Sequence, residues 1–236
     1  MPEFSGQTVD LYTGDFDGNG VDDILAAVVG YAIDGTVKVC YGFKVYITGS
    51  SGPPFTYAFP PSSVFTIMHG RKQSSFACPD IDGDGRDDIL LSGVIYNDIV
   101  EKWQATGIHA FISQSHGSVV DFDHQVFAGP PNPYTFYMPE KFDRGQVRDF
   151  DGDGRFDFAF FGTDNNWNVL RGYLWTYADG WVLLPALSYG SAFSQAERIS
   201  VIDINGDGQT EVHLRFEAPI RSMIMRLNPS STDWEM

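Results

Sequence analysis

One acidic motif occurs four times along the 236-residue chain, and an apolar stretch follows each copy. The copies cover residues 15–23, 80–88, 149–157 and 203–211, and the second of them reads DIDGDGRDD. We call these segments loops 1 to 4 and number their positions 1 to 9. A motif repeated along a chain indicates a series of similar supersecondary units that stack on one another. This repeat constrains the fold more than any other feature of the sequence.

The second loop has the spacing of a cation site. Carboxylates that crowd together repel one another unless a cation lies among them or water solvates an exposed turn. Hard oxygen donors at alternating positions are typical of Ca²⁺ loops, and the two glycines allow the tight turn. The donors are Asp80, Asp82, Asp84, the backbone carbonyl of Arg86 and Asp88. An EF-hand would need a glutamate at position 12, but Leu91 stands there, inside a strand-like run.

A second element repeats in phase with the loops and favours an all-β fold. Each unit contains a segment whose faces alternate like those of a half-buried strand, at 42–47, 107–112, 172–177 and 223–227. Proline-rich stretches at 52–61 and 129–139 read as connectors. The sequence therefore predicts one domain, a β-propeller of four blades at about 4–62, 63–128, 134–192 and 193–236. Each blade is a four-stranded antiparallel sheet with the acidic loop between its first two strands, and residues 4–11 supply a closing strand.

The loops and the strands around them resemble the FG-GAP or VCBS repeat of integrin-α-type propellers and of some propeller lectins. The resemblance covers all four units, although the Phe-Gly word of that family has a partial counterpart only at Phe161-Gly162. It implies up to four Ca²⁺ ions. The implied ligands, with position 7 contributing its carbonyl, are Asp15, Asp17, Asn19, Val21 and Asp23; Asp80, Asp82, Asp84, Arg86 and Asp88; Asp149, Asp151, Asp153, Arg155 and Asp157; and Asp203, Asn205, Asp207, Gln209 and Glu211. Loops 1 and 4 are expected to bind more weakly, because neutral asparagines replace a charged ligand in each.

The composition limits the classes of partner. The formal net charge of −16 disfavours nucleic acid, and four Ca²⁺ ions would halve that charge. A content of 43% hydrophobic residues and 25 glycines indicates a folded, turn-rich β protein. No apolar run is long enough to span a bilayer, and the first residues lack the pattern of a signal peptide. We expect an extracellular or cell-surface protein given as a mature or excised chain, and an oligomer if the sheet edges stay unpaired.

Nothing in the sequence identifies an enzyme. The five histidines are scattered; His109 and His213 lie in strand patterns and read as packed side chains. His116 and His124 bracket an Asp-Phe-Asp segment that could form a small polar site, but no nucleophile or oxyanion donor stands near it. The two cysteines, Cys40 and Cys78, are interpreted as free thiols, with a single bridge between neighbouring strands as the alternative.

The hairpins that follow the second strands are the candidate ligand site. An aromatic ring beside amides and carboxylates suits a sugar, whose C–H face stacks while its hydroxyls form hydrogen bonds. The candidate residues are Tyr31, Tyr96, Asn97, Asp98, Asn165, Asn166, Trp167 and Asn168. We therefore expect a calcium-stabilised binding module that recognises carbohydrate or glycoprotein. The alternatives are an interaction or scaffold domain of a larger toxin-like or surface protein and, with less support, an enzyme acting on polysaccharide.

Overall fold

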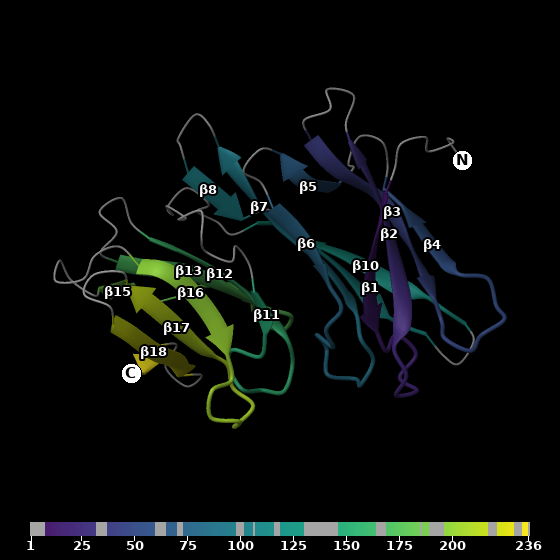
Figure 1. The fold of residues 1–236 in the computed structure, drawn as a ribbon. Helices are drawn as coiled ribbons and strands as arrows, with labels where there is room; N and C mark the ends of the chain where they lie inside the picture. The colour runs from purple at the N-terminus through teal and green to yellow at the C-terminus, as the bar shows by residue number, and fades with distance from the viewer. Residues whose placement is uncertain are drawn as a thin grey trace. The chain divides into compact units, whose positions relative to one another are not determined.

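The protein is built from β-strands throughout the part of the chain described by the structure, a computed structural model (Figure 1). The described residues are 8–31, 37–59, 65–69, 73–97, 102–105, 107–115, 119–129, 146–163, 169–184, 186–188, 196–216, 221–228 and 233–235. Within these ranges there is no long apolar helix of the kind that crosses a membrane. The predicted all-β class is confirmed.

The strands form four antiparallel sheets, each with a path of four strands that follow one another in chain order. The first sheet runs β1 (Thr8–Gly14), β2 (Asp23–Tyr31), β3 (Val37–Tyr46) and β4 (Phe55–Ala58), with β5 (Phe65–His69) beside β3. The second runs β6 (Gln73–Ala77), β7 (Ile89–Asn97), β9 (Ile108–Ser113) and β10 (Phe122–Phe127), with β8 (Lys102–Ala105) beside β7. The third runs β11 (Gln146–Arg148), β12 (Asp157–Thr163), β13 (Val169–Thr176) and β14 (Gly180–Leu183), with β15 (Leu187–Ser188) beside β13. The fourth runs β16 (Ala196–Ile202), β17 (Glu211–Phe216), β18 (Arg221–Asn228) and β19 (Asp233–Glu235).

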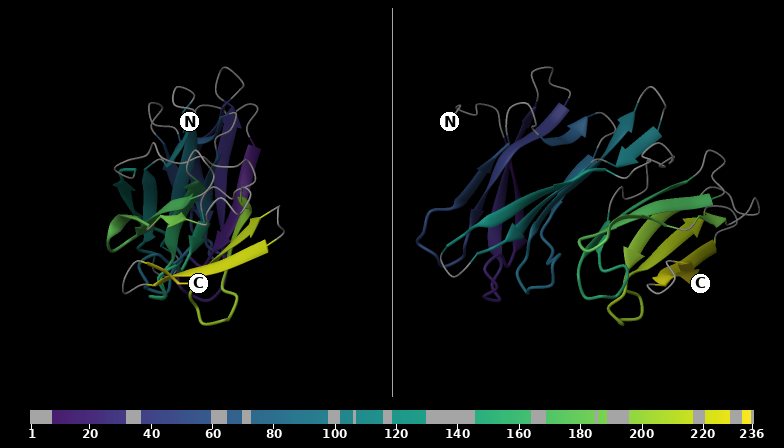
Figure 2. Two further views of the ribbon diagram at one scale, coloured as in Figure 1. Left: turned by 90° about the vertical axis from the view of Figure 1, so that its left-hand side faces the viewer. Right: turned by 180° about the vertical axis from the view of Figure 1, so that it is seen from behind.

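Each acidic loop joins the first two strands of its sheet, as the sequence predicts. Figure 2 shows this in the fourth sheet, where the yellow-green loop 4 connects two neighbouring strands. The first sheet extends past the predicted blade boundary after residue 62, because β5 pairs with β3. The sequence predicts that residues 4–11 supply a strand that closes the ring. Residues 8–11 of this segment belong to β1, which pairs with β2 along its whole length.

The chain divides into two compact units, residues 1–95 with 108–127 and residues 96–107 with 128–236. In the first unit, β2 shows why the sheet has a buried face. Alternate residues from Asp23 through Leu25 and Ala27 are fully buried, whereas Ile24 between them is exposed, because successive side chains of a strand point to opposite faces. Aromatic rings fill the same core, and the rings of Phe43 and Phe111 meet edge to face at 4.9 Å.

Gly42 in β3 allows the close approach of the neighbouring strand. A Cβ atom at this position would lie 2.2 Å from the carbonyl oxygen of Tyr57 in β4. Any larger residue would therefore push the strands apart. Tyr57 pairs with Phe43, one residue further along β3, so Gly42 also allows Tyr57 to lie close to β3.

The second unit has its own apolar core. Phe150 from loop 3, Leu174 from β13, Leu214 from β17 and Met225 from β18 are all buried in it. These residues come from the third and fourth sheets, so a single core stabilises both. The second residue of loop 3 is thus part of the hydrophobic interior, and burial fixes the loop at that end.

Candidate metal centres in the acidic loops

The four loops share one backbone conformation. The glycines at positions 4 and 6 of every loop have positive φ angles, between 72° at Gly18 and 93° at Gly208. Residues with a Cβ atom rarely adopt this conformation, so glycine is required wherever the loop turns this way. The loops therefore form the same tight curl despite their different sequences.

The first carboxylate of each loop organises that curl. It accepts backbone N–H hydrogen bonds from further along the loop on both of its oxygens. At Asp80 the donors are Gly83 at 2.7 Å and Gly85 at 2.9 Å, and a third such bond comes from Asp84 at 3.2 Å. Positions 4 and 6 donate in the same way in loops 3 and 4, from Gly152 and Gly154 to Asp149 (2.6 and 2.9 Å) and from Gly206 and Gly208 to Asp203 (2.6 and 3.0 Å). In loop 1 the donors to Asp15 are Asn19 at position 5 and Gly20 at position 6 (3.0 and 2.7 Å). The side chain at position 1 thus faces the inside of the curl.

The acid at position 9 is the buried member of the set. Asp23 and Asp88 are fully buried, Asp157 is 2% exposed and Glu211 is 5% exposed. Each accepts a hydrogen bond from the backbone N–H at position 2 of its own loop, at 2.8 to 3.1 Å. An ionised carboxylate in such a place is costly unless a positive charge compensates it.

In the first three loops these acids converge. Carboxylate oxygens at positions 1, 3 and 9 lie within 4.8 Å of one another, in the groups Asp15–Asp17–Asp23, Asp80–Asp82–Asp88 and Asp149–Asp151–Asp157. An all-oxygen donor set of this kind suits a hard divalent cation such as Ca²⁺. These nine predicted ligands are therefore placed where they can hold one ion per loop.

Position 5 behaves differently from the predicted ligand pattern. Asp84 and Asp153 are not part of the converging groups. Each accepts a hydrogen bond from the N–H at position 7, and Asp84 also pairs with the guanidinium of Arg86. Asn19 makes the same bond to Val21 at 2.8 Å. As the loops stand, position 5 stabilises the turn, and its role as a ligand stays a prediction, as does that of the carbonyl at position 7.

Loop 4 departs from the other three. Its amide Asn205 donates to Asp207 at 3.0 Å and to Glu211 at 3.4 Å, and Arg226 pairs with Asp207 at 3.3 Å. Its acids do not form a converging group of the kind found in loops 1 to 3. The hydrogen bonds from Asn205 and the ion pair with Arg226 therefore stabilise the acids of loop 4, and its weaker binding of Ca²⁺ stays a prediction.

Burial changes the protonation of the position 9 acids. Desolvation raises the pKa of Asp88 to about 7, against the effect of the N–H bonds from Ser113 and Ile81. Desolvation, with a smaller effect of the nearby Asp151, raises the pKa of Asp157 to about 8. The pKa of Asp23 is also raised, mainly by burial. Without a cation, these groups therefore hold protons at a pH where exposed carboxyls are ionised.

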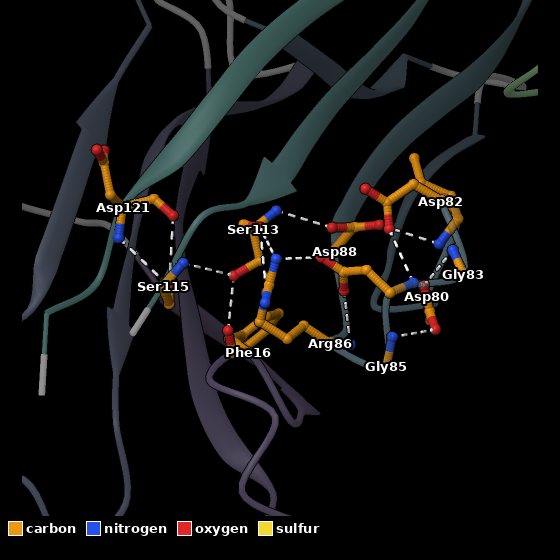
Figure 3. A network of polar contacts seen from close by, with 12 residues as sticks. Phe16, Asp80, Asp82, Gly83, Gly85, Arg86, Asp88, Ser113, Ser115 and Asp121 are labelled. Atoms are coloured by element: carbon orange, nitrogen blue, oxygen red, sulfur yellow. Dashed lines mark hydrogen bonds and ion pairs between the residues drawn. The ribbon is translucent and has the colours of Figure 1, made fainter. Parts of the chain in front are cut away.

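Loops 1 and 2 are tied together within the first unit. The N–H of Asp87 donates to the carbonyl of Asp15 at 2.8 Å, and the N–H of Asp15 donates to the Asp87 carboxylate at 2.8 Å. Close by, Ser113 at the end of β9 donates through its hydroxyl to the carbonyl of Phe16 at 2.6 Å and through its N–H to Asp88 at 2.8 Å (Figure 3). The hydrogen bonds thus run from loop 1 through β9 to loop 2.

Loops 3 and 4 repeat this connection within the second unit. The N–H of Thr210 donates to the carbonyl of Asp149 at 2.9 Å, at the loop positions used by Asp87 and Asp15. The amide of Gln209 donates to the carbonyl of Phe150 at 3.0 Å. Sequence reasoning missed these connections. The sequence carries no signal for the backbone bonds, because the donor at position 8 is an N–H that any residue except proline supplies.

The predicted hairpin ligand site is described in part. Tyr31 ends β2, and Tyr96 and Asn97 end β7. The remaining candidates, Asp98, Asn165, Asn166, Trp167 and Asn168, lie outside the residues that the structure describes. Elsewhere, Cys40 and Cys78 are free, as predicted. Of the two histidines proposed for a small polar site, His116 lies outside the described residues, and His124 contacts Tyr57 and His109.

Comparison with known proteins identifies the repeat. Residues 149–214, from loop 3 through most of β17, match the family model of the FG-GAP-like repeat. None of the curated proteins matches the chain. The match covers the part of the second unit in which loops 3 and 4 are joined, and the same loop geometry recurs in the first unit.

The raised pKa values predict how stability depends on pH. A carboxyl whose pKa is higher in the folded state binds a proton there first, so the free energy of unfolding falls as pH rises through the interval between the two values. For Asp157 this interval runs from 3.8 to about 8. We expect metal-free protein with Asp157→Asn to lose less stability than the unchanged protein between about pH 5 and about pH 8.

The measurement is a series of thermal melts in chelator. The exposed Asp179, in the same unit, provides a control as Asp179→Asn, which should follow the unchanged protein. His109 and His124, whose pKa values burial lowers, contribute the opposite slope below their ordinary pKa of 6.5. Because this histidine contribution is the same in every variant, the prediction concerns the difference in the pH dependence of stability between the variants. Identical slopes for Asp157→Asn and the unchanged protein would contradict it.

The bond between loops 1 and 2 predicts an effect at Asp87. Replacing Asp87 with alanine leaves the N–H of Asp15 without this acceptor and should lower the free energy of unfolding by about 1–3 kcal/mol. Asp22 occupies the same position in loop 1 and is exposed, so Asp22→Ala controls for the loss of an acidic charge. Chemical denaturation measures both variants. Equal stabilities of the two would show that the bond contributes nothing.

Proposed function

We propose that this chain, which carries an FG-GAP-like repeat over residues 149–214, is a calcium-stabilised binding module of the β-propeller type. In this proposal the four sheets are its blades. The observation that carries the proposal is the convergence of three carboxylates in each of loops 1, 2 and 3. FG-GAP-like repeats often bind Ca²⁺, and an oxygen-only donor set fits that ion.

The ion would act as a structural pin. Asp23, Asp88 and Asp157 would each supply one buried ligand, with the acids at positions 1 and 3 completing the carboxylate set. Bound Ca²⁺ would compensate the charges that these loops otherwise hold close together. It requires the ionised form of each ligand, so its affinity should rise with pH as the position 9 acid loses its proton.

Coordinated carboxylates are poorly suited to catalysis. A bound cation keeps them ionised, so they cannot readily serve as general acids. We therefore propose binding, not catalysis, as the activity of this module. Recognition would lie on the loops that the sheets present, because function commonly resides in loops held by a rigid scaffold.

The proposal predicts a calcium-dependent melting temperature. We expect Ca²⁺ to raise the melting temperature and a chelator to lower it, because a ligand that binds only the folded state stabilises that state. Asp82→Asn and Asp151→Asn should each remove one tight site from a calorimetric titration. Asp207→Asn, at position 5 of loop 4, controls for the loss of one acidic charge from a loop and should retain all of the tight sites. A melting temperature that is the same in Ca²⁺ and in chelator would overturn the proposal.

Carbohydrate recognition by the hairpins stays a prediction that a glycan array in Ca²⁺ can test. We expect binding to a defined glycan class that Trp167→Ala reduces by about tenfold, since an aromatic contact contributes about 0.5–1.5 kcal/mol beyond the area that it buries. Tyr177→Ala, outside the proposed site, is the control. If no glycan binds to Ca²⁺-loaded protein, the module is better explained as a protein-interaction or scaffold domain of a larger extracellular or surface protein.

A further inference from the structure

Two histidines of the second sheet face each other across a short distance. His109 lies in β9 and His124 in β10, and Nδ1 of His109 lies 3.1 Å from Nε2 of His124. The rings are nearly parallel, with 17° between their planes and 5.3 Å between their centroids. Both side chains are half-buried, so one edge of the pair stays within reach of solvent.

The second nitrogen of His124 is held in place from the first sheet. Nδ1 of His124 lies 3.0 Å from the hydroxyl of Tyr57 in β4. The ring of Phe111 stacks on the His124 ring at 4.2 Å, with 5° between the planes. Hydrogen bonding at one ring nitrogen and stacking on one face together fix where Nε2 points. Such an outer partner is what orients a metal-binding imidazole.

The spacing of the two nitrogens matches that of two ligands on one ion. Two nitrogens each about 2.0–2.1 Å from a tetrahedral zinc ion lie roughly 3.3 Å apart. At 3.1 Å the two nitrogens face each other in a hydrogen bond, so binding requires both rings to turn until their lone pairs converge on an ion beside the line between them. Imidazole nitrogen suits zinc and copper(II), whereas calcium prefers oxygen. This pair therefore selects a different class of ion from the acidic loops.

We propose that His109 and His124 form a binding site for a divalent transition-metal ion, zinc or copper(II), with Tyr57 orienting His124. His124 Nε2 and His109 Nδ1 are the protein ligands, and water fills the remaining positions. In the bound state one ring proton lies on His124 Nδ1, toward Tyr57, and the other on His109 Nε2. The neutral pair already carries two protons, so binding releases none.

Two features favour occupancy near neutral pH. Burial lowers the pKa of both imidazoles, and for His109 the neighbouring His124 lowers it further, so both are neutral and able to bind a metal. The charge of Asp123, whose side chain is exposed on β10, acts on His124 and partly offsets this lowering of its pKa. A negative charge close to the pair, in a chain with a net charge of −16, attracts divalent cations.

The test is a zinc titration of the full chain saturated with Ca²⁺, followed by calorimetry. We expect one site whose affinity falls at least tenfold in His109→Gln and in His124→Gln. The half-buried strand histidine His213 provides the matched control, and His213→Gln should bind zinc like the unchanged protein. Tyr57→Phe should weaken binding by about tenfold without removing it, since an outer partner typically contributes 10–100-fold in affinity.

A spectroscopic measurement identifies the ligands independently. With one equivalent of copper(II), electron paramagnetic resonance should show coupling to two imidazole nitrogens, which disappears in either histidine variant. If the glutamine variants do not fold, Tyr57→Phe decides the matter, because unchanged zinc affinity there would overturn the proposal. Loss of zinc binding to the same extent in His213→Gln would also overturn it and indicate adventitious surface binding. These outcomes do not depend on whether the acidic loops bind Ca²⁺.

Discussion

A buried acid at the last position of each loop is the constraint on which the sheets depend. In the first sheet Asp23 joins three segments, because it begins β2, accepts from Phe16 at the start of the loop and accepts from Thr48 beyond the end of β3. Asp88 joins the same three segments of the second sheet through Ile81 and Ser113. One carboxyl group thus positions the loop and two strands at once. In its ionised form it needs a compensating cation, and without a cation it holds a proton.

The loops also join neighbouring sheets. The N–H at position 8 of one loop donates to the carbonyl at position 1 of the loop before it, at 2.8 Å from Asp87 and at 2.9 Å from Thr210. The acceptors, Asp15 and Asp149, are residues whose side chains converge with the other acids of their loops. An interaction that orders one loop therefore also orders part of the next loop. The two sheets of each unit stabilise each other in this way.

Local features of this protein could be predicted from its sequence, and non-local ones could not. The acids at positions 1, 3 and 9 and the glycines between them act within nine residues, so spacing alone predicted the curl and the buried strand after it. Loop 4 already looked atypical because of Asn205 and Glu211. The meeting of His109 with His124 depends on the register between β9 and β10, and the contact with Tyr57 depends on packing against another sheet. Neither follows from a pattern along the chain, so His109 read as an ordinary packed residue.

The two kinds of candidate metal site in the first unit differ in what an ion would do there. The acidic loops hold carboxylates that repel one another, so a hard cation would relieve this repulsion and stabilise the fold. The His109–His124 pair is already satisfied by hydrogen bonds and by stacking on Phe111, so an ion there would replace interactions that are favourable without it. The loops should therefore contribute mainly to stability. In our proposal the histidine pair, half-buried between two sheets, would gain or lose an ion while the sheets stay intact, which is the property that a site for exchangeable metal requires.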